Sequence, residues 1–274
     1  MAMESIASPS RSSALNRIWR IAATGFCFAL FGIGGLAMST LWFTALRLTI
    51  KDPERCSSLT QGSIRNSFRL FLWLTRALGV LDYRFDGVEK FQEDRGTLVV
   101  SNHPSLLDYV FLASCMPRCD CIVKQSLLKN VFMRGVIKAA GYIPNADSET
   151  LLPLCKKRLD DNGMLLIFPE GTRTTPNEPM QLQRGAANVA VRCGVDIRLV
   201  TIHCDPPMLT KRGKWYNIPP VKPLFQIAVK EKLCVRDYIA DGDASPAIAA
   251  RRLTQTLSQR LVPEPVQTNE KNNG

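Results

Sequence analysis

A stretch of 26 residues without a charge, Ile21 to Leu46, constrains this chain more than any other feature. As a straight α-helix it would be about 39 Å long, which exceeds the roughly 30 Å hydrocarbon core of a bilayer. We therefore expect residues 19–50 to be embedded in a membrane. Glycine permits kinks, and three glycines lie near the middle of the stretch: Gly32, Gly34 and Gly35. The segment is thus either one helix or a re-entrant hairpin.

The charges on either side of this stretch are balanced, so they do not orient it. Three basic residues precede it and three follow: Arg11, Arg17, Arg20, Arg47, Lys51 and Arg55. The rule that places positively charged loops in the cytoplasm then does not indicate an orientation for the segment. Equal charge suits a hairpin with both ends in the cytoplasm and leaves a single span open. A cleaved signal peptide is disfavoured, because its apolar part is typically shorter. Residues 1–18 are expected to form a polar N-terminal segment.

A further helical segment is expected in residues 51–83. Its part "SIRNSFRLFLWLTRALGVLDY" (63–83) mixes apolar and basic side chains, including Phe68, Arg65 and Arg69. Cationic residues beside Phe, Leu and Trp are typical of an amphipathic helix that lies on an anionic bilayer surface. An ordinary packed helix has the same pattern, and the sequence leaves both interpretations open.

The pattern changes after residue 84, where short apolar runs alternate with stretches of helical length. Five runs are expected to be strands: Thr97–Ser101, Cys121–Lys124, Met164–Phe168, Ile197–His203 and Leu224–Val229. Two helices are expected, each ended by a glycine: Thr150–Leu159 and Gln183–Cys193. This alternation predicts an α/β domain over residues 84–262, with a mixed central sheet flanked by helices. The polar tail, residues 263–274, is expected to be disordered.

The composition narrows the class of partner without choosing one. Lysine and arginine outnumber the acids 35 to 24, and the net charge of +11 favours anionic partners. Nine scattered cysteines, an odd number, fit a reducing compartment better than a disulfide framework. Cys115, Cys119 and Cys121 lack a fourth ligand for a tetrahedral zinc site, so no metal is expected there.

The sequence "NHPSLLDY" (102–109) follows the first predicted strand and contains one of the two histidines of the chain. One interpretation is structural: Pro104 opens a helix, and Ser105 with Asp108 forms its capping pattern. The other is chemical. Histidine suits general-base catalysis because its ordinary pKa lies near neutrality, and a carboxylate at one ring nitrogen fixes the tautomer. Spacing alone leaves both open; His103 and Asp108 are the candidate catalytic pair.

The sequence "FPEGTRT" (168–174) follows another predicted strand, and open α/β sheets bind ligands at the carboxyl ends of their strands. Gly171 would let the backbone approach a ligand, and Arg173 is a fixed cation suited to bidentate binding of phosphate. A polar turn would have the same composition. Lys124, at the end of a predicted strand, is a further candidate for contact with an anionic substrate, although most lysines are solvated.

Together the two motifs resemble those of the glycerolipid acyltransferase family. "NHPSLLD" matches its N-H-x4-D pattern and "FPEGTR" its second motif, and the resemblance extends over roughly residues 80–230. It implies an α/β fold and a membrane-bound O-acyltransferase of phospholipid biosynthesis. Such an enzyme moves a fatty acyl group from acyl-CoA or acyl-carrier protein to the hydroxyl of a lysophospholipid such as 1-acyl-glycerol-3-phosphate. The resemblance implies no metal or redox cofactor.

The same resemblance implies roles for individual residues. His103 would be the general base that deprotonates the acceptor hydroxyl, and Asp108 would orient it. Four residues would help to hold the acceptor, with the arginine at its phosphate: Glu170, Gly171, Thr172 and Arg173.

One position departs from the family pattern. Asp147 stands about where the family commonly has an arginine that binds the phosphate of the acceptor. An acid there would repel phosphate, which leaves open another hydroxylated lipid, a glycolipid or a polyene-pathway acceptor. Arg134 or Lys138 is a candidate to supply the missing charge.

Two other classes of function fit parts of the sequence. A non-catalytic protein that binds anionic lipid would keep the fold without turnover. A nucleic-acid binder is disfavoured, because it needs a basic face with stacking aromatic residues, and six of the aromatic residues lie in the apolar segment 19–50. The expected partners are membrane lipids and the acyl donor, with no nucleic acid. The expected location is a bacterial inner membrane, with the active site on the cytoplasmic side where acyl thioesters are supplied.

Overall fold

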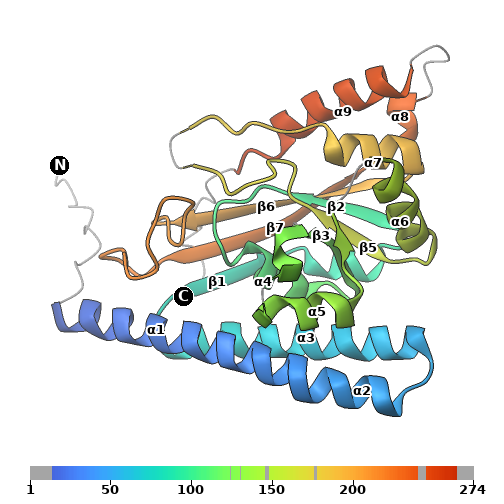
Figure 1. The fold of residues 1–274 in the computed structure, drawn as a ribbon. Coiled ribbons are helices and arrows are strands. Elements are labelled where there is room, and N and C mark those ends of the chain that lie inside the picture. Colours follow the sequence, from blue (N-terminus) through green and yellow to red (C-terminus); the bar gives the residue numbers. More distant parts are fainter. Residues whose placement is uncertain are drawn as a thin grey trace, which may run out of the picture.

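The computed structural model describes residues 14–123, 125–129, 131–145, 148–175, 178–239 and 245–263. Across these residues runs a seven-stranded sheet in the order β1-β7-β6-β2-β5-β3-β4 (Figure 1). The strands are β1 (Asp82–Asp86), β2 (Thr97–Ser101), β3 (Cys119–Val123), β4 (Ile143–Pro144), β5 (Met164–Ile167), β6 (Ile197–Asp205) and β7 (Leu224–Leu233). Neighbouring strands are parallel except β6 and β7, so the sheet is mixed, as predicted.

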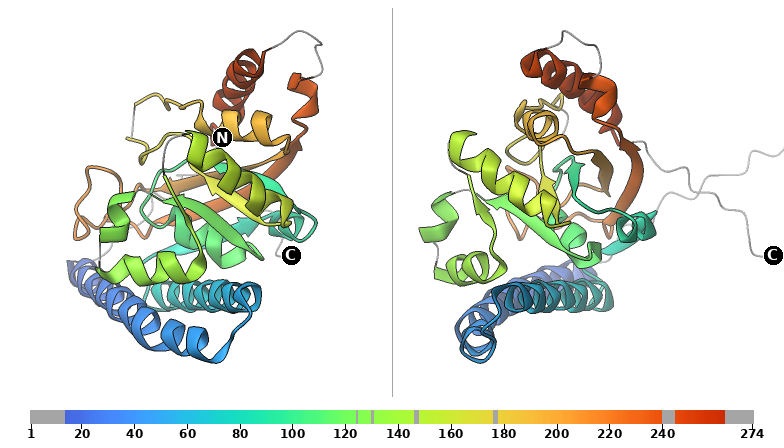
Figure 2. Two further views of the ribbon diagram at one scale, coloured as in Figure 1. Left: turned by 45° about the vertical axis from the view of Figure 1, so that its right-hand side comes forward. Right: turned by 90° about the vertical axis from the view of Figure 1, so that its right-hand side faces the viewer.

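Helices cover both faces of this sheet (Figure 2). One face carries α6 (Ser148–Asp160), α7 (Gly185–Cys193) and α9 (Pro246–Arg260). The other carries α3 (Pro53–Ala77), α4 (Asp108–Cys115) and α5 (Val131–Ala140). Short helices complete the described chain: η2 (Val88–Gln92), η3 (Gln125–Lys129) and α8 (Arg236–Ile239).

Strand β2 lies in the middle of the sheet and supplies both cores. All five of its residues are buried. Leu98 and Val100 belong to the cluster under α6, α7 and α9, whereas Val99 belongs to the cluster on the other face. Successive side chains of a strand point to opposite faces, so a strand buried on both sides is continuously apolar. That is why this strand was predicted with its correct bounds.

The predicted membrane segment is one helical run. Helix α1 (Ala14–Ala37) continues through a π-helical turn, η1 (Met38–Trp42), into α2 (Phe43–Thr49). The three central glycines lie inside α1, so the chain does not reverse direction at them. The run Ala14–Thr49 is long and apolar enough, by length and composition, to cross a membrane.

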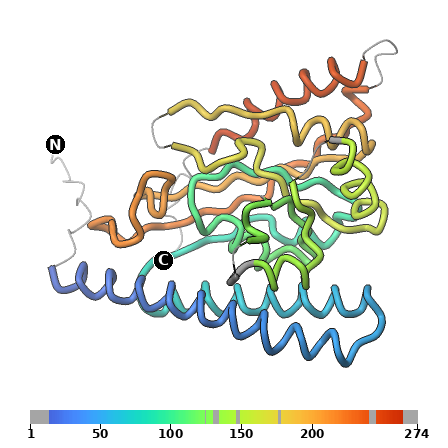
Figure 3. The backbone as a smooth tube through the Cα atoms, viewed as in Figure 1, coloured from blue at the N-terminus to red at the C-terminus, as the bar shows by residue number. Residues whose placement is uncertain are grey.

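The chain reverses after this run and returns as α3, alongside α1 (Figure 3). Asp52 caps α3: its side chain accepts a hydrogen bond from the backbone N–H of Glu54 at 3.1 Å, and proline follows at the first helical position. The helix therefore begins ten residues before the amphipathic stretch 63–83. It ends at Ala77, followed by Gly79 with φ of +73°.

Other boundaries differ from the prediction by a few residues. The sheet begins at β1 with Asp82, two residues before the expected start of the domain. Strands β1 and β4 were missed: both lie at the edges of the sheet, where β1 has no fully buried residue and β4 has only two residues. Residues 14–18 of the predicted polar segment belong to α1; residues 1–13 and 264–274 lie outside the described residues.

Candidate active site

The carboxyl end of β2 is extended by the side chain of Asn102. Its amide nitrogen donates to the carbonyl of Ile202 at 2.7 Å, and its amide oxygen accepts from the N–H of Ile202 at 2.7 Å. The buried side chain thus replaces a peptide group in the ladder between β2 and β6. Asn102 fixes the residue that follows it, a role that the sequence prediction missed.

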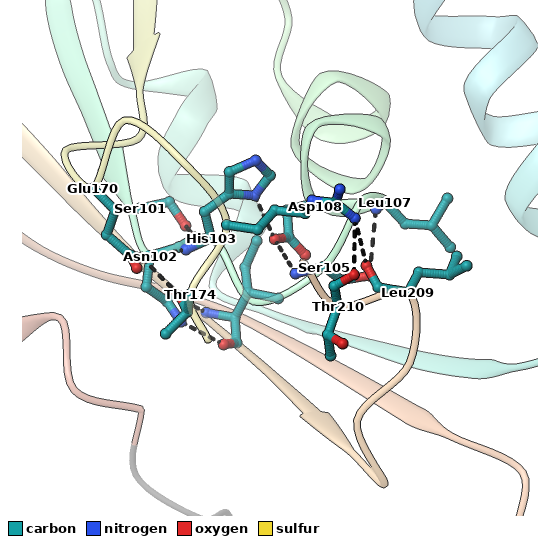
Figure 4. Close-up of polar contacts among 12 residues, drawn as sticks. Ser101, Asn102, His103, Ser105, Leu107, Asp108, Glu170, Thr174, Leu209 and Thr210 are labelled. Atoms are coloured by element: carbon teal, nitrogen blue, oxygen red, sulfur yellow. Dashed lines mark hydrogen bonds and ion pairs between the residues drawn. The ribbon is translucent and has the colours of Figure 1, made fainter. Parts of the chain in front are cut away.

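His103 and Asp108 meet directly (Figure 4). The imidazole Nδ1 lies 2.8 Å from Asp108 Oδ2. The side chain of Asp108 is fully buried, whereas that of His103 is 20% exposed. Because a carboxylate accepts, the pair assigns the imidazole proton to Nδ1 and leaves Nε2 with a free lone pair. The histidine ring stacks on Phe168, with ring centroids 4.1 Å apart and planes at 17°.

Asp108 has few partners for a buried acid. Its Oδ2 also accepts the backbone N–H of Ser105 at 2.7 Å, while Oδ1 has no hydrogen-bond partner in the described part of the chain. Burial raises the pKa of Asp108 to about 6, against the opposing effect of His103 and the Ser105 N–H. The imidazole of His103 therefore helps to stabilise the ionised form of Asp108.

The helix predicted to open at Pro104 begins four residues later, at Asp108. The hydroxyl of Ser105 donates to the carbonyl of Met208 at 3.0 Å, and the N–H of Leu106 donates to the carbonyl of Leu209 at 3.1 Å. Residues 104–107 are therefore tied to the loop after β6. The capping interpretation was wrong about the helix start and right about the contact from Asp108 back to Ser105.

The loop after β5 forms hydrogen bonds with the backbone of the same histidine. Glu170, which is buried, accepts from the backbone N–H of His103 at 2.8 Å and from the hydroxyl of Thr174 at 2.9 Å, both at Oε1. The N–H of Thr174 donates to the carbonyl of His103 at 2.7 Å. Glu170 thus holds the two motifs together across 67 positions of sequence.

Arg173 is half-buried and clamps the loop after β6. Its Nη1 donates to the carbonyl of Leu209 at 3.0 Å and to that of Thr210 at 3.1 Å. Gly171 has φ of +67°, and a Cβ there would lie 3.2 Å from the amide of Gln183, so the turn favours glycine. Thr172 is exposed.

The other residues considered for contact with an anionic substrate include two that the structure does not describe. Lys124 and Asp147 lie outside the described residues, whereas Arg134 and Lys138 are exposed on α5. Within the described ranges, no group of three or more His, Cys, Asp and Glu side chains is arranged to hold a metal ion. All nine cysteines are free thiols.

Residues 82–205, which include both motifs and the strands that carry them, match the family described as Acyltransferase. Over this segment the chain is similar to the acyltransferase family of enzymes. Individual proteins that resemble the chain are also named as acyltransferases. The chain is 33% identical over 156 residues to the 1-acyl-sn-glycerol-3-phosphate acyltransferase of Helicobacter pylori, a match that covers 54% of this chain and 62% of that protein.

A second relative is 1-acyl-sn-glycerol-3-phosphate acyltransferase beta of Homo sapiens, at 30% identity over 115 residues, 39% of this chain and 41% of that protein. These matches thus span less than two thirds of either relative. The crystal structure of the 1-acyl-sn-glycerophosphate (LPA) acyltransferase from Thermotoga maritima has a TM-score of 0.67 at 18% identity and covers 90% of this chain and 96% of that chain. At that identity the likeness shows a shared fold.

Proposed function

We propose that this chain is a membrane-bound O-acyltransferase that transfers a fatty acyl group to the hydroxyl of a lysophospholipid. The observation that carries the proposal is the His103–Asp108 pair, in which Asp108 holds Nδ1 at 2.8 Å and Nε2 remains available to a substrate. The acceptor class is supported by the relatives named as 1-acyl-sn-glycerol-3-phosphate acyltransferases. The donor is acyl-CoA or acyl-carrier protein.

The chemistry follows from the pair. Nε2 of His103 takes the proton of the acceptor hydroxyl as its oxygen attacks the thioester carbonyl of the donor. The C–S bond breaks, an ester forms, and the imidazolium returns its proton to the departing thiolate. Asp108 stabilises the transient imidazolium. A positioned base of this kind contributes about 10²–10⁴-fold to rate.

The FPEGTR loop is proposed to hold the acceptor. Arg173 and the exposed Thr172 lie on the loop that Glu170 fixes against His103. Nη1 of Arg173 already binds two carbonyls, so it positions a substrate-binding loop as well as presenting charge. Another hydroxylated lipid acceptor is distinguished from a lysophospholipid by the assay below.

The N-terminal helix indicates membrane association. Only 17% of its most apolar window is buried, and large apolar side chains of α1 are exposed, among them Ile18, Phe26 and Ile33. We infer that residues 19–50 and 51–83 bind the bilayer and that residues 84–262 form the catalytic domain. We place that domain on the cytoplasmic side of a bacterial inner membrane, where acyl thioesters are made.

The test is acyl transfer by the purified full chain in lipid nanodiscs. Radiolabelled acyl-CoA or acyl-carrier protein is supplied with a panel of acceptors, and products are identified by mass spectrometry. We expect 1-acyl-glycerol-3-phosphate to be acylated and His103→Ala to abolish the reaction. His203→Ala, in β6, is the matched control and should remain active. An unacylated panel, or full activity of His103→Ala, contradicts the proposal.

A further inference from the structure

The connection from β6 to β7 carries a basic and aromatic segment, residues 210–217, here called the basic loop. Its sequence is "TKRGKWYN", with three cations and no acid. Every residue from Lys211 to Asn217 is exposed. Lys214 lies over the ring of Tyr216, 5.5 Å from its centroid, and Arg212 has one acidic partner, the exposed Glu178 at 3.5 Å. The loop therefore presents net positive charge beside aromatic rings.

The four tryptophans of the chain share an unusual environment. Each is about half exposed: Trp19 55%, Trp42 50%, Trp73 60% and Trp215 47%. Tryptophan is concentrated at membrane–water interfaces, where an apolar ring and a polar N–H are both satisfied. Three of the four belong to the hairpin of α1, η1 and α3, and the fourth belongs to the basic loop.

Direct contacts hold the basic loop against α1. The ring of Trp215 meets Phe28 edge to face at 6.4 Å, and it lies over Gly25 so closely that a Cβ there would be 3.2 Å away. Just beyond the loop, the buried Arg20 donates to the carbonyls of Pro219 at 3.0 Å and Val221 at 3.2 Å. Figure 1 shows this connection above the first turns of α1. A bilayer bound by α1 is therefore within reach of the loop.

The other end of the loop reaches the candidate active site. The carbonyls of Leu209 and Thr210 both accept from Arg173. The basic loop thus contacts both the apolar helix and the FPEGTR motif.

We propose that the basic loop is a second membrane contact, which binds the anionic headgroup layer of a bilayer beside α1. Its cations provide the charge complementarity, and Trp215 provides the amphipathic ring that suits the interface. A soluble anionic donor is the competing occupant. The basic character alone suits both, but the contact with α1 and the half-exposed tryptophan favour the bilayer. The proposal rests on membrane association of α1 and not on acyl transfer.

The experiment measures where Trp215 lies. The full chain with Trp19→Phe, Trp42→Phe and Trp73→Phe retains one tryptophan and is placed in nanodiscs of brominated phosphatidylcholine, with or without phosphatidylglycerol. We expect shorter-wavelength emission and stronger bromine quenching in the anionic discs, by a factor of about two or more. Lys211→Gln/Arg212→Gln/Lys214→Gln should return that ratio to about one, since each basic residue near an anionic surface strengthens binding about fivefold.

The matched control removes three exposed charges from the other face of the sheet: Lys157→Gln, Arg192→Gln and Arg251→Gln. It should keep the quenching ratio of the parent. If the single-tryptophan chain does not fold, Trp215→Phe in the otherwise native chain should remove the anion-dependent quenching. Equal quenching in both kinds of disc overturns the proposal. So does a basic-loop variant that weakens acyl-CoA binding and leaves Trp215 quenching unchanged. Neither readout needs turnover, so failure of acyl transfer is a separate result.

Discussion

Two buried aspartates flank strand β2, and they are held in different ways. Asp94, before the strand, is 1% exposed and receives a two-pronged ion pair from Arg198, with both N–O distances at 2.8 Å. Lys232 adds a third cationic contact at 3.4 Å. Asp108, after the strand, is 0% exposed, and its polar partners among the described residues are the imidazole of His103 and the backbone N–H of Ser105.

The difference separates a structural charge from the one that we propose to be reactive. A guanidinium is always protonated, so Asp94 keeps a permanent counter-charge at the amino end of β2. In the proposed reaction the imidazole of His103 takes up a proton, so the charge balance around Asp108 alters. Burial raises the pKa of Asp108 to about 6. The reactive pair lies at the carboxyl end of the strand, where open α/β sheets bind ligands.

The largest expected effect separates the two aspartates by activity. Asp108→Asn should lower kcat about 10²–10⁴-fold, because the amide no longer stabilises the imidazolium. Asp94→Asn should change kcat per folded molecule less than about twofold, since Asp94 lies at the other end of β2. Acyl-transfer kinetics with folded protein quantified by circular dichroism checks this. Equal losses in both variants would remove the distinction.

The next effect is on stability. Arg198→Gln leaves Asp94 buried with only Lys232, and loss of one partner of a buried ion pair typically costs about 3–5 kcal/mol. Thermal unfolding in detergent should show a large fall in Tm. Arg260→Gln, which removes the exposed pair with Glu231, should cost about 0–1 kcal/mol. Similar shifts in the two variants would contradict a structural role for Asp94.

The third effect is a pH dependence at Asp108. Its folded pKa of about 6 exceeds the ordinary value of 3.8, so the folded state binds more protons between these values. Its contribution to stability is present below about pH 4 and is lost as pH rises to about 6, by about 3 kcal/mol. Asp108→Asn lacks this loss. The Tm of the variant minus that of the parent should rise across this window and then level off; a constant difference would refute the assignment.

The smallest expected effect concerns Glu170. Glutamine keeps an oxygen that accepts from the N–H of His103 and the hydroxyl of Thr174, so Glu170→Gln should lower kcat less than about tenfold. Glu170→Ala removes both acceptors and should lower kcat further, with KM for the acceptor nearly unchanged. A rise in acceptor KM in the glutamine variant would instead indicate that the carboxylate contacts the substrate.

Features set by neighbouring residues were predictable. The continuously apolar run Thr97–Ser101 implied a strand buried on both faces. His103 and Asp108 are five positions apart, so a single turn brings them together, and the sequence identified both as candidates. That they form a hydrogen-bonded pair at the end of β2 is what the fold adds.

Contacts between distant parts of the chain were not predictable. Asn102 bonds to Ile202, 100 positions away, and Glu170 bonds to the backbone of His103, 67 positions away. The sequence suggested that Arg173 faces a phosphate, and this stays a prediction; the structure adds that its Nη1 binds the carbonyls of Leu209 and Thr210. Hydrogen-bond partners depend on where the chain returns, which no local pattern records.

By itself the sequence determined that an apolar helix precedes an α/β domain and that a histidine and an aspartate follow its central strand. Periodicity and charge along consecutive residues carry that information, because they decide which faces are buried. Only the tertiary structure decided that Asp94 is neutralised by Arg198 while Asp108 depends on His103. Both acids are buried beside the same strand, but Arg198 lies 104 positions from Asp94, whereas His103 lies five positions from Asp108.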